Sequence, residues 1–335
     1  AQPTLRGRRS DDIEHLPGRA GFLVPDANLM TKLRDRYRAR FPGKRIIGIS
    51  WRSGNRDSAA IRSLDLPYWK QLLDQPDCAF VSLQYGDISR DLEELKEQLG
   101  DDIYDRVYWD REINPLGNLD PFAAQIAAVD LVISVDNSTV HFAGGLGKPC
   151  WVMVPINSDW RWQLDRADTA WYESLELFRQ DKASGWDDVI GRIVTRLATL
   201  DDDTLNAADL RHHYRSATVL AKAQRHGEAE GYWRLLLAAG DHKPEALQGI
   251  ALSALAVGQA TDAVAILFRA AELAPGDVAI KADLAWALAN AGEGERGYAM
   301  ARQLTRDHPE STAAQTACGR ILWKMARPDE ATNHF

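Results

Sequence analysis

The chain has 335 residues, of which 45% are hydrophobic and 26% charged, and its formal net charge is −8. This length allows about two compact domains, and the lack of any Lys- or Arg-rich run argues against nucleic acid as a partner. No stretch of 18 apolar residues occurs, so we expect a soluble, cytoplasmic protein without a membrane span.

Residues 1–41 are expected to form the tail of a preceding unit and a connecting helix. Asp26 is well placed to cap a helix that runs to Phe41 and ends at Pro42-Gly43. The segment is too short to be a domain by itself. We therefore expect the natural protein to contain a further domain before it.

Residues 42–203 are predicted to form an α/β domain of the Rossmann-like type. Short apolar runs alternate there with amphipathic stretches, which is typical of a parallel sheet covered by helices. The expected strands are Arg45–Trp51, Ala79–Leu83, Val107–Trp109, Leu131–Val135 and Cys150–Val154. The expected helices span about residues 67–74, 89–99, 120–129, 139–146 and 186–200.

Residues 204–335 are predicted to form an all-α solenoid of tetratricopeptide (TPR) repeats. Gly258 aligns with Gly292 at a spacing of 34 residues, which is the TPR period. A poorer copy spans about residues 214–245, and a partial one begins near residue 312. Because the array stops abruptly, we expect that the natural chain continues or that another surface covers this end.

The cysteines and the remaining polar clusters are not expected to bind metal. Cys78, Cys150 and Cys318 are widely spaced in apolar stretches, so we predict buried thiols in a reducing compartment. His212-His213 and Asp201–Asp203 are adjacent residues, a spacing that does not suit a metal site on a helix, and are predicted to be polar surface.

The strongest candidate for a ligand-binding turn follows the strand Leu131–Val135. A polar turn and a helix of small residues bring backbone N–H groups and the positive end of a helix to the carboxyl edge of the sheet. Such a turn suits a diphosphate. Its candidate residues are Asp136, Asn137, Ser138, Thr139 and His141. The alternative is that Asp136 or Ser138 only caps a buried helix.

This turn resembles the donor-binding motif of the ADP-heptose:lipopolysaccharide heptosyltransferase family. It is more similar still to TPR-fused glycosyltransferases of bacteria, through Asp136–His141, Gly147–Pro149 and Asp159–Trp162. The resemblance covers about residues 40–180. It implies the donor-binding half of a GT-B fold, a nucleotide sugar as substrate, inverting transfer without a metal ion, and no further cofactor. The TPR surface would then recruit a protein or glycan acceptor.

The same resemblance, together with position at strand ends, points to three further loops. Their candidate donor-binding residues are Arg52, Ser53, Gly54, Asn55, Arg62, Gln84, Tyr85 and Asp120. Alternatives stay open: the first loop is solvated surface, Tyr85 packs at a turn, and Asp120 is an N-cap. Ser158–Trp162 either closes over the sugar or forms a hydrophobic clasp with Trp171 and Tyr172.

The catalytic residues are left unassigned. Inverting enzymes of the GT-B type generally take their base from the amino-terminal domain, which we expect to lie outside this chain. Three functions are considered: a glycosyltransferase, a non-catalytic TPR scaffold with a vestigial nucleotide-binding domain, and a GT-B-fold sugar-nucleotide epimerase. Glycosyltransferase is the function that we expect.

Overall fold

The chain divides into two compact units between His212 and His213. Asp203, where the sequence placed the boundary, lies at the start of a long helix, α10 (Asp202–Lys222), which continues past the observed division. The beginning of α10 packs on the first unit, because Leu205 belongs to that unit's hydrophobic core. The computed structural model of the chain describes residues 21–54, 59–164, 166–181 and 185–331.

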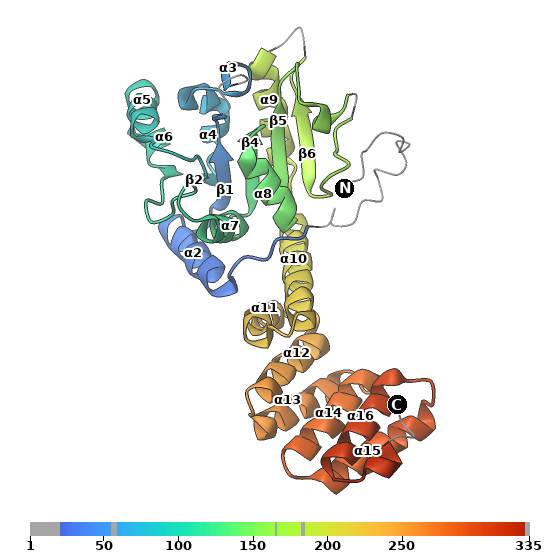
Figure 1. The fold of residues 1–335 in the computed structure, drawn as a ribbon. Coiled ribbons are helices and arrows are strands. Elements are labelled where there is room, and N and C mark those ends of the chain that lie inside the picture. The colour runs from blue at the N-terminus through green and yellow to red at the C-terminus, as the bar shows by residue number, and fades with distance from the viewer. Residues whose placement is uncertain (1–20, 55–58, 165, 182–184, 332–335) are drawn as a thin grey trace. The chain divides into compact units, whose positions relative to one another are not determined.

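A sheet of six parallel strands forms the centre of the first unit, in the order β3-β2-β1-β4-β5-β6 (Figure 1). The strands are β1 (Arg45–Ser50), β2 (Cys78–Ser82), β3 (Val107–Tyr108), β4 (Leu131–Val135), β5 (Cys150–Val154) and β6 (Leu175–Arg179). The five predicted strands are confirmed to within one residue at each end. Every residue of β2, β4 and β5 is buried, so these strands are continuous apolar runs in the sequence.

The sixth strand, β6, is not predicted from the sequence. It lies at the edge of the sheet, and Glu176 and Arg179 in it remain partly exposed. Charged residues on an edge strand discourage pairing with other chains. The same charges interrupt the apolar run by which the interior strands are recognised.

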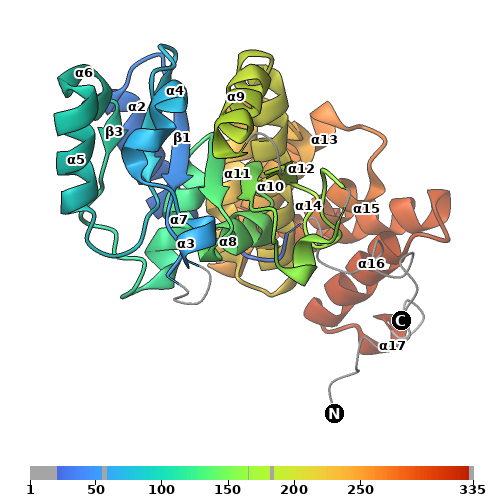
Figure 2. The same ribbon diagram turned by 90° about the horizontal axis from the view of Figure 1, so that it is seen from above.

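Helices cover both faces of this sheet. In the first unit they are α2 (Ala27–Arg40), α3 (Ala59–Arg62), η1 (Leu66–Trp69), α4 (Lys70–Leu73), α5 (Ser89–Leu99), α6 (Asp101–Tyr104), α7 (Leu119–Ala128), α8 (Ser138–Leu146), η2 (Trp160–Trp162) and α9 (Gly185–Ala198). Figure 2 shows α4 and α9 on one side of the sheet and α7 and α8 on the other. Trp51, Trp69 and Phe80 are fully buried in one cluster with Ile193 of α9.

The predicted helix after Asp26 is confirmed as α2. The Asp26 carboxylate accepts a hydrogen bond from the backbone N–H of Leu29 at 2.7 Å, which caps the helix. Met30, Leu33 and Tyr37 are buried, and α2 packs against α7. Although the sequence suggests a connecting helix, α2 is an integral part of the helical cover of the first unit.

A buried ionic cluster joins three helices of the first unit. The Lys148 side chain is only 4% exposed, and its Nζ lies 2.7 Å from Asp209 Oδ1. Arg34 Nη2 lies 2.7 Å from Asp209 Oδ2. Both cations also donate to the backbone carbonyl of Ala127. The cluster fixes the start of α10 against α2 and the end of α7.

The polar residues around the unit boundary divide into two groups. Asp201–Asp203 are exposed, as predicted. His212 and His213 are buried, so the prediction that they form polar surface is wrong. His212 Nδ1 lies 2.6 Å from the carbonyl oxygen of Leu146, because α10 passes the end of α8.

The second unit consists of helices that pack each against the next in the chain. After α10 these are α11 (His226–Ala239), α12 (Lys243–Ala256), α13 (Ala260–Leu273), α14 (Val278–Asn290), α15 (Gly294–Asp307), α16 (Thr312–Lys324) and α17 (Pro328–Ala331). Gly258 and Gly292 follow α12 and α14 with φ of +83° and +90°, a conformation that favours glycine. A Cβ atom on Gly297 would lie 2.4 Å from the Ala285 carbonyl oxygen, so α14 and α15 cross closely.

Three further observations concern the described residues. All three cysteines are buried, as predicted. Within the described ranges, no helix is long and apolar enough to cross a lipid bilayer. No three His, Cys, Asp or Glu side chains of the described residues come together in a group that could hold a metal ion.

Candidate functional site

The candidate site lies at the carboxyl edge of the sheet, where α3 also lies (Figure 1). The strand order reverses between β1 and β4, and open α/β sheets bind ligands outside the carboxyl ends of the strands at such a reversal. A pocket of about 300 Å³ opens here. It is lined by Ser53, Gly54, Arg62, Tyr85, Asp136, Asn137, Ser138, His141 and Arg161. All of these except Arg161 are among the candidate donor-binding residues predicted from the sequence.

Asn137 joins the two central loops of the site. Its Oδ1 accepts from the backbone N–H of Thr139 at 2.9 Å and so caps α8. Its Nδ2 donates to Ser50 Oγ at 2.7 Å and to the Arg52 carbonyl at 3.0 Å. The cap of α8 is therefore Asn137, and the alternative that assigned it to Asp136 or Ser138 is wrong.

Gln84 does not line the pocket but holds the loop that follows β1. The residue is 3% exposed, and its Oε1 accepts from the backbone N–H groups of Trp51 and Arg52 at 2.9 and 2.8 Å. The same oxygen also accepts from Ser50 Oγ at 3.1 Å. Because these bonds hold the loop after β1, the structure gives Gln84 a supporting position rather than a ligand contact.

The two arginines that line the pocket pair with two carboxylates, Asp136 in the lining and Asp159 next to it in the chain of ion pairs. Arg62 Nη1 lies 3.1 Å from Asp136 Oδ2, and Arg62 Nη2 lies 3.8 Å from Asp159 Oδ2. Arg161 Nε lies 3.1 Å from Asp159 Oδ1. Burial raises the pKa of Asp136, and the charge of Arg62 opposes that rise. With both carboxylates ionised, the four side chains carry no net charge.

His141 holds Arg161 in place from the first turns of α8. Its Nε2 lies 3.2 Å from Arg161 Nη1, and its Nδ1 lies 3.3 Å from the Tyr172 hydroxyl. A guanidinium can only donate, so Nε2 accepts and the ring is neutral. The ring also stacks on Trp162 at 5.6 Å between centroids. Burial lowers the pKa of His141 to about 4.

Glycines allow aromatic rings to approach the pocket. A Cβ atom on Gly54 would lie 2.8 Å from the Tyr85 hydroxyl, and one on Gly144 would lie 2.3 Å from Tyr172 Cγ. The glycine within α8 thus makes room for Tyr172, which contacts His141.

Besides Gln84, three predicted ligand residues of the described ranges lie apart from the pocket lining. The Arg52 guanidinium pairs with Asp91 at 2.9 Å, and Thr139 is fully buried. Asp120 is exposed at the start of α7. It does not cap that helix, because Asn118 accepts the capping bond from the Asp120 N–H. Asn55 lies outside the described residues.

The loop after β5 forms the clasp that was one of its two expected roles, and it also contributes to the pocket lining. Arg161 lines the pocket, and Trp162 is fully buried against the ring of His141. Trp160 is 67% exposed and meets Trp171 edge-on. Trp171 Nε1 donates to the Arg161 carbonyl at 2.9 Å, which clasps the loop. The alternation of Trp and Arg in the sequence indicates that this loop has a specific role, but it does not show which side chain faces the pocket.

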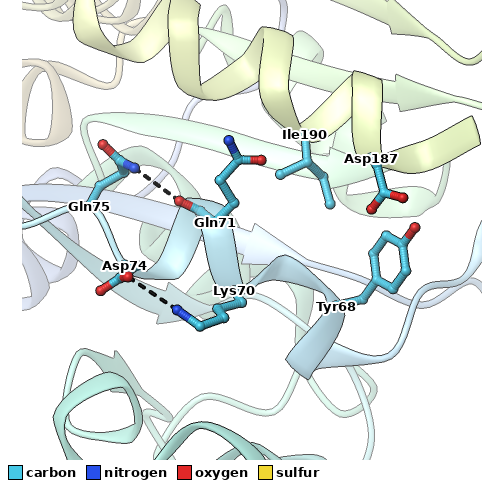
Figure 3. A pocket seen from close by; sticks show the side chains of 7 residues that line it. All are labelled: Tyr68, Lys70, Gln71, Asp74, Gln75, Asp187 and Ile190. Atoms are coloured by element: carbon cyan, nitrogen blue, oxygen red, sulfur yellow. Dashed lines mark hydrogen bonds and ion pairs between the residues drawn. The ribbon is translucent and has the colours of Figure 1, made fainter. Parts of the chain in front are cut away.

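A second hollow of about 420 Å³ lies between α4 and α9. It is lined by Tyr68, Lys70, Gln71, Asp74, Gln75, Asp187 and Ile190 (Figure 3). Its polar groups already bind one another: Lys70 Nζ lies 3.2 Å from Asp74 Oδ2, and Gln75 Nε2 donates to the Gln71 carbonyl at 2.9 Å. This hollow lacks the concentration of cations found at the first pocket.

Comparison with known proteins identifies the repeats. Residues 254–321 match the tetratricopeptide repeat family. The chain is 33% identical over 198 residues to Protein FlbA of Caulobacter vibrioides; the match covers 58% of this chain and 31% of that protein. A crystal structure of YrrB, described as a TPR protein with an unusual peptide-binding site, shares 16% identity at a TM-score of 0.31, over 43% of this chain and 79% of that one. The family match confirms the prediction of TPR repeats, and such repeats are typical of protein–protein interaction.

Proposed function

We propose that the first unit binds the diphosphate of a nucleotide sugar and that the chain acts within a glycosyltransferase. The observation that carries this proposal is the meeting of Arg62, Arg161 and the amino-terminal end of α8 in one pocket. Helix amino termini and arginines are the groups that proteins use most often to hold phosphate. In this proposal the TPR repeats bring a protein or glycan acceptor to the donor.

The surroundings of the pocket support a nucleotide ligand. The strand order with its reversal between β1 and β4 is that of the Rossmann-like sheets, which bind dinucleotides at this point. The pocket volume of about 300 Å³ is sufficient for a diphosphate and part of a sugar. Ser138 is exposed at the start of α8 and offers a hydroxyl donor. Two arginines and a helix end supply positive charge, so we propose donor binding without a metal ion.

The carboxylates of the pocket set a condition on this binding. Asp136 and Asp159 occupy the arginines, so an incoming diphosphate competes with them. Asp159 is the more accessible of the two, with a side chain 21% exposed against 2% for Asp136. We propose that Asp159 releases Arg62 and Arg161 when the diphosphate binds.

The proposed roles of the described residues concern the donor side of the reaction. Arg62 and Arg161 would offset the charge that develops on the departing nucleotide diphosphate. His141 is neutral and accepts from Arg161, so it acts as a positioning residue for that guanidinium. Inverting transfer also requires a base for the acceptor hydroxyl, and we assign none to this chain.

Calorimetry with UDP, ADP, GDP and CMP on the full chain tests the proposal. We expect one of these nucleotides to bind, and we expect Arg62→Ala with Arg161→Ala to abolish that binding. Arg90→Ala is the matched control, because Arg90 is an exposed arginine on α5 and does not line the pocket. Failure of all four nucleotides to bind the unmodified chain would contradict the proposal.

A non-catalytic TPR scaffold is the second candidate, and the charge balance of the pocket favours it. In a site that no longer binds a ligand, the arginines can remain paired with the neighbouring carboxylates. In that case the same calorimetry gives no heat with any nucleotide, and Asp159→Asn does not restore binding.

A further inference from the structure

Helix α8, whose first turn lies at the candidate site, consists mostly of weak helix formers. Its nine residues include two adjacent glycines, Gly144 and Gly145, and only Ala143 and Leu146 are strong helix formers. Isolated helices of this length are not stable in water, even with better sequences. Contacts with other parts of the chain must therefore keep α8 formed.

The two glycines of α8 are required by neighbouring side chains. A Cβ atom on Gly144 would lie 2.3 Å from Tyr172 Cγ, and one on Gly145 would lie 2.9 Å from Leu23 Cδ1. Alanine at either position would favour the helix but would displace the side chain that packs there. Because this packing requires residues that weaken α8, the helix depends on the bonds made at its ends.

Two carbonyl groups in the last turn of α8 are bound from distant parts of the chain. The last four carbonyl groups of a helix have no partner within it, and Gly145 and Leu146 are buried away from water. The Gly145 carbonyl accepts from the backbone N–H groups of Phe22 and Leu23 at 2.6 and 2.7 Å. The Leu146 carbonyl lies 2.6 Å from Nδ1 of His212. A carbonyl can only accept, so His212 carries a proton on Nδ1 and donates it to this bond.

His212 belongs to α10, the helix that continues into the second unit. The residue is 8% exposed, so water does not readily take its place at the Leu146 carbonyl. Asp209, about one turn earlier on α10, pairs with Lys148 shortly after the end of α8. Helix α10 thus holds the end of α8 at two points.

A continuous series of contacts leads from this end of α8 to the pocket. Gly144 packs against Tyr172, whose hydroxyl lies 3.3 Å from Nδ1 of His141. The other ring nitrogen of His141 accepts from Arg161 at 3.2 Å, and Arg161 lines the pocket. Opening of the last turn of α8 would therefore release Tyr172 and, through it, the ring that holds Arg161.

We propose that His212 is a positioning residue for the candidate site. Its bond to the Leu146 carbonyl keeps α8 formed, and α8 then presents its amino-terminal N–H groups and the Arg161 held by His141 to the ligand. The residue that completes α8 is also the last one before the division between the two units. The part of this inference that concerns nucleotide binding rests on the proposed function, whereas the support of α8 by His212 does not.

Hydrogen exchange of the full chain, measured without nucleotide, tests the support of α8. His212→Ala removes the donor, and we expect the amides of residues 142–146 to exchange about tenfold faster, as for a buried carbonyl that loses its hydrogen bond. His212→Asn places an amide donor near the position of Nδ1 and should restore slow exchange. His212→Leu keeps a buried side chain without a donor, and it replaces His212→Ala if that variant does not fold.

His213→Ala is the matched control. It removes a ring of similar burial from the next position of α10, and this ring contacts Tyr232 of α11 at 5.9 Å between centroids. We expect unchanged exchange of residues 142–146 in this variant. Equal acceleration in the control, or none in His212→Ala and His212→Leu, would overturn the proposal. Thermal unfolding of each variant establishes that it is folded.

Calorimetry with UDP, ADP and GDP gives the second readout. The affinity for the nucleotide that the unmodified chain binds should fall about tenfold in His212→Ala and recover in His212→Asn. Faster exchange of α8 with unchanged nucleotide affinity would overturn the positioning role. If the unmodified chain binds none of the nucleotides, the proposed function fails, and the exchange result still decides whether His212 supports α8.

Discussion

Two ionic clusters in the first unit use the same kinds of side chain in different surroundings. In the buried cluster, Asp209 lies between Lys148 and Arg34, and both cations also bind the Ala127 carbonyl. At the pocket, Arg62, Arg161 and Asp136 line an open volume, and Asp159 pairs with both arginines. The first arrangement leaves no room for a ligand. In the proposed function, the second exchanges a carboxylate for a phosphate, and accessible volume is what distinguishes this candidate site from the buried cluster.

Replacement of Asp209 with Ala should produce the largest effect, because it leaves Lys148 buried without its carboxylate. We expect the free energy of unfolding of the first unit to fall by about 4 kcal/mol. Burial already lowers the pKa of Lys148, so deprotonation of Lys148 in the variant would reduce the loss of stability. Urea denaturation followed by tryptophan fluorescence measures the change. Asp202→Ala is the control, because Asp202 also pairs with an arginine, Arg45, but is 76% exposed. An equal loss of unfolding free energy in both variants would show that burial of the ion pair does not determine the destabilisation.

Acid should lower the unfolding free energy of the first unit through the protonation of His141. Its pKa is about 4 in the folded state against 6.5 ordinarily, so the unfolded chain takes up a proton first as the pH falls. Stability present above pH 6.5 is then lost progressively down to pH 4. The loss between pH 7 and pH 5 should be about 2 kcal/mol.

Denaturation of the unmodified chain and of His141→Phe at both pH values isolates this contribution. Phenylalanine keeps the stacking on Trp162 and removes the titrating group. The difference between the two proteins should shrink or reverse toward acid pH. An equal pH dependence in both would show that His141 is not the group responsible.

Asn137→Ala tests whether the two central loops are held by one side chain. The change removes the cap of α8 and the bonds to Ser50 and Arg52, which should cost about 1.5 kcal/mol in unfolding free energy. Asn118→Ala removes only the cap of α7 and should cost less. If both variants lose the same amount, the bridge between the loops contributes nothing measurable.

The sequence predicts most of this framework because the relevant signals are local. Strands buried along their whole length appear as apolar runs, and the polar turn after β4 stands out at its carboxyl end. The choice between ligand contact and support depends on pairings distant in the sequence, which no local pattern shows. Gln84 and Asn137 are examples, since each binds the loop around Ser50 to Arg52. In the same way, Asp159 is recognisable as part of a motif but not as the partner of two arginines.

Asp159→Asn has the smallest expected effect, a change in ligand affinity. It tests most directly whether the cluster at the pocket differs from the buried cluster around Asp209. If Asp159 competes with the ligand, its neutral isostere should increase the affinity for the nucleoside diphosphate by about tenfold, equivalent to roughly 1.4 kcal/mol. Asp168→Asn is the control: it removes the same charge from the same loop region, at a residue that pairs with Arg166 and is 65% exposed. Unchanged affinity in Asp159→Asn would mean that the carboxylate does not compete. Weaker binding would mean instead that Asp159 orients Arg62 and Arg161, in which case the pocket cluster is structural in the same sense as the cluster around Asp209.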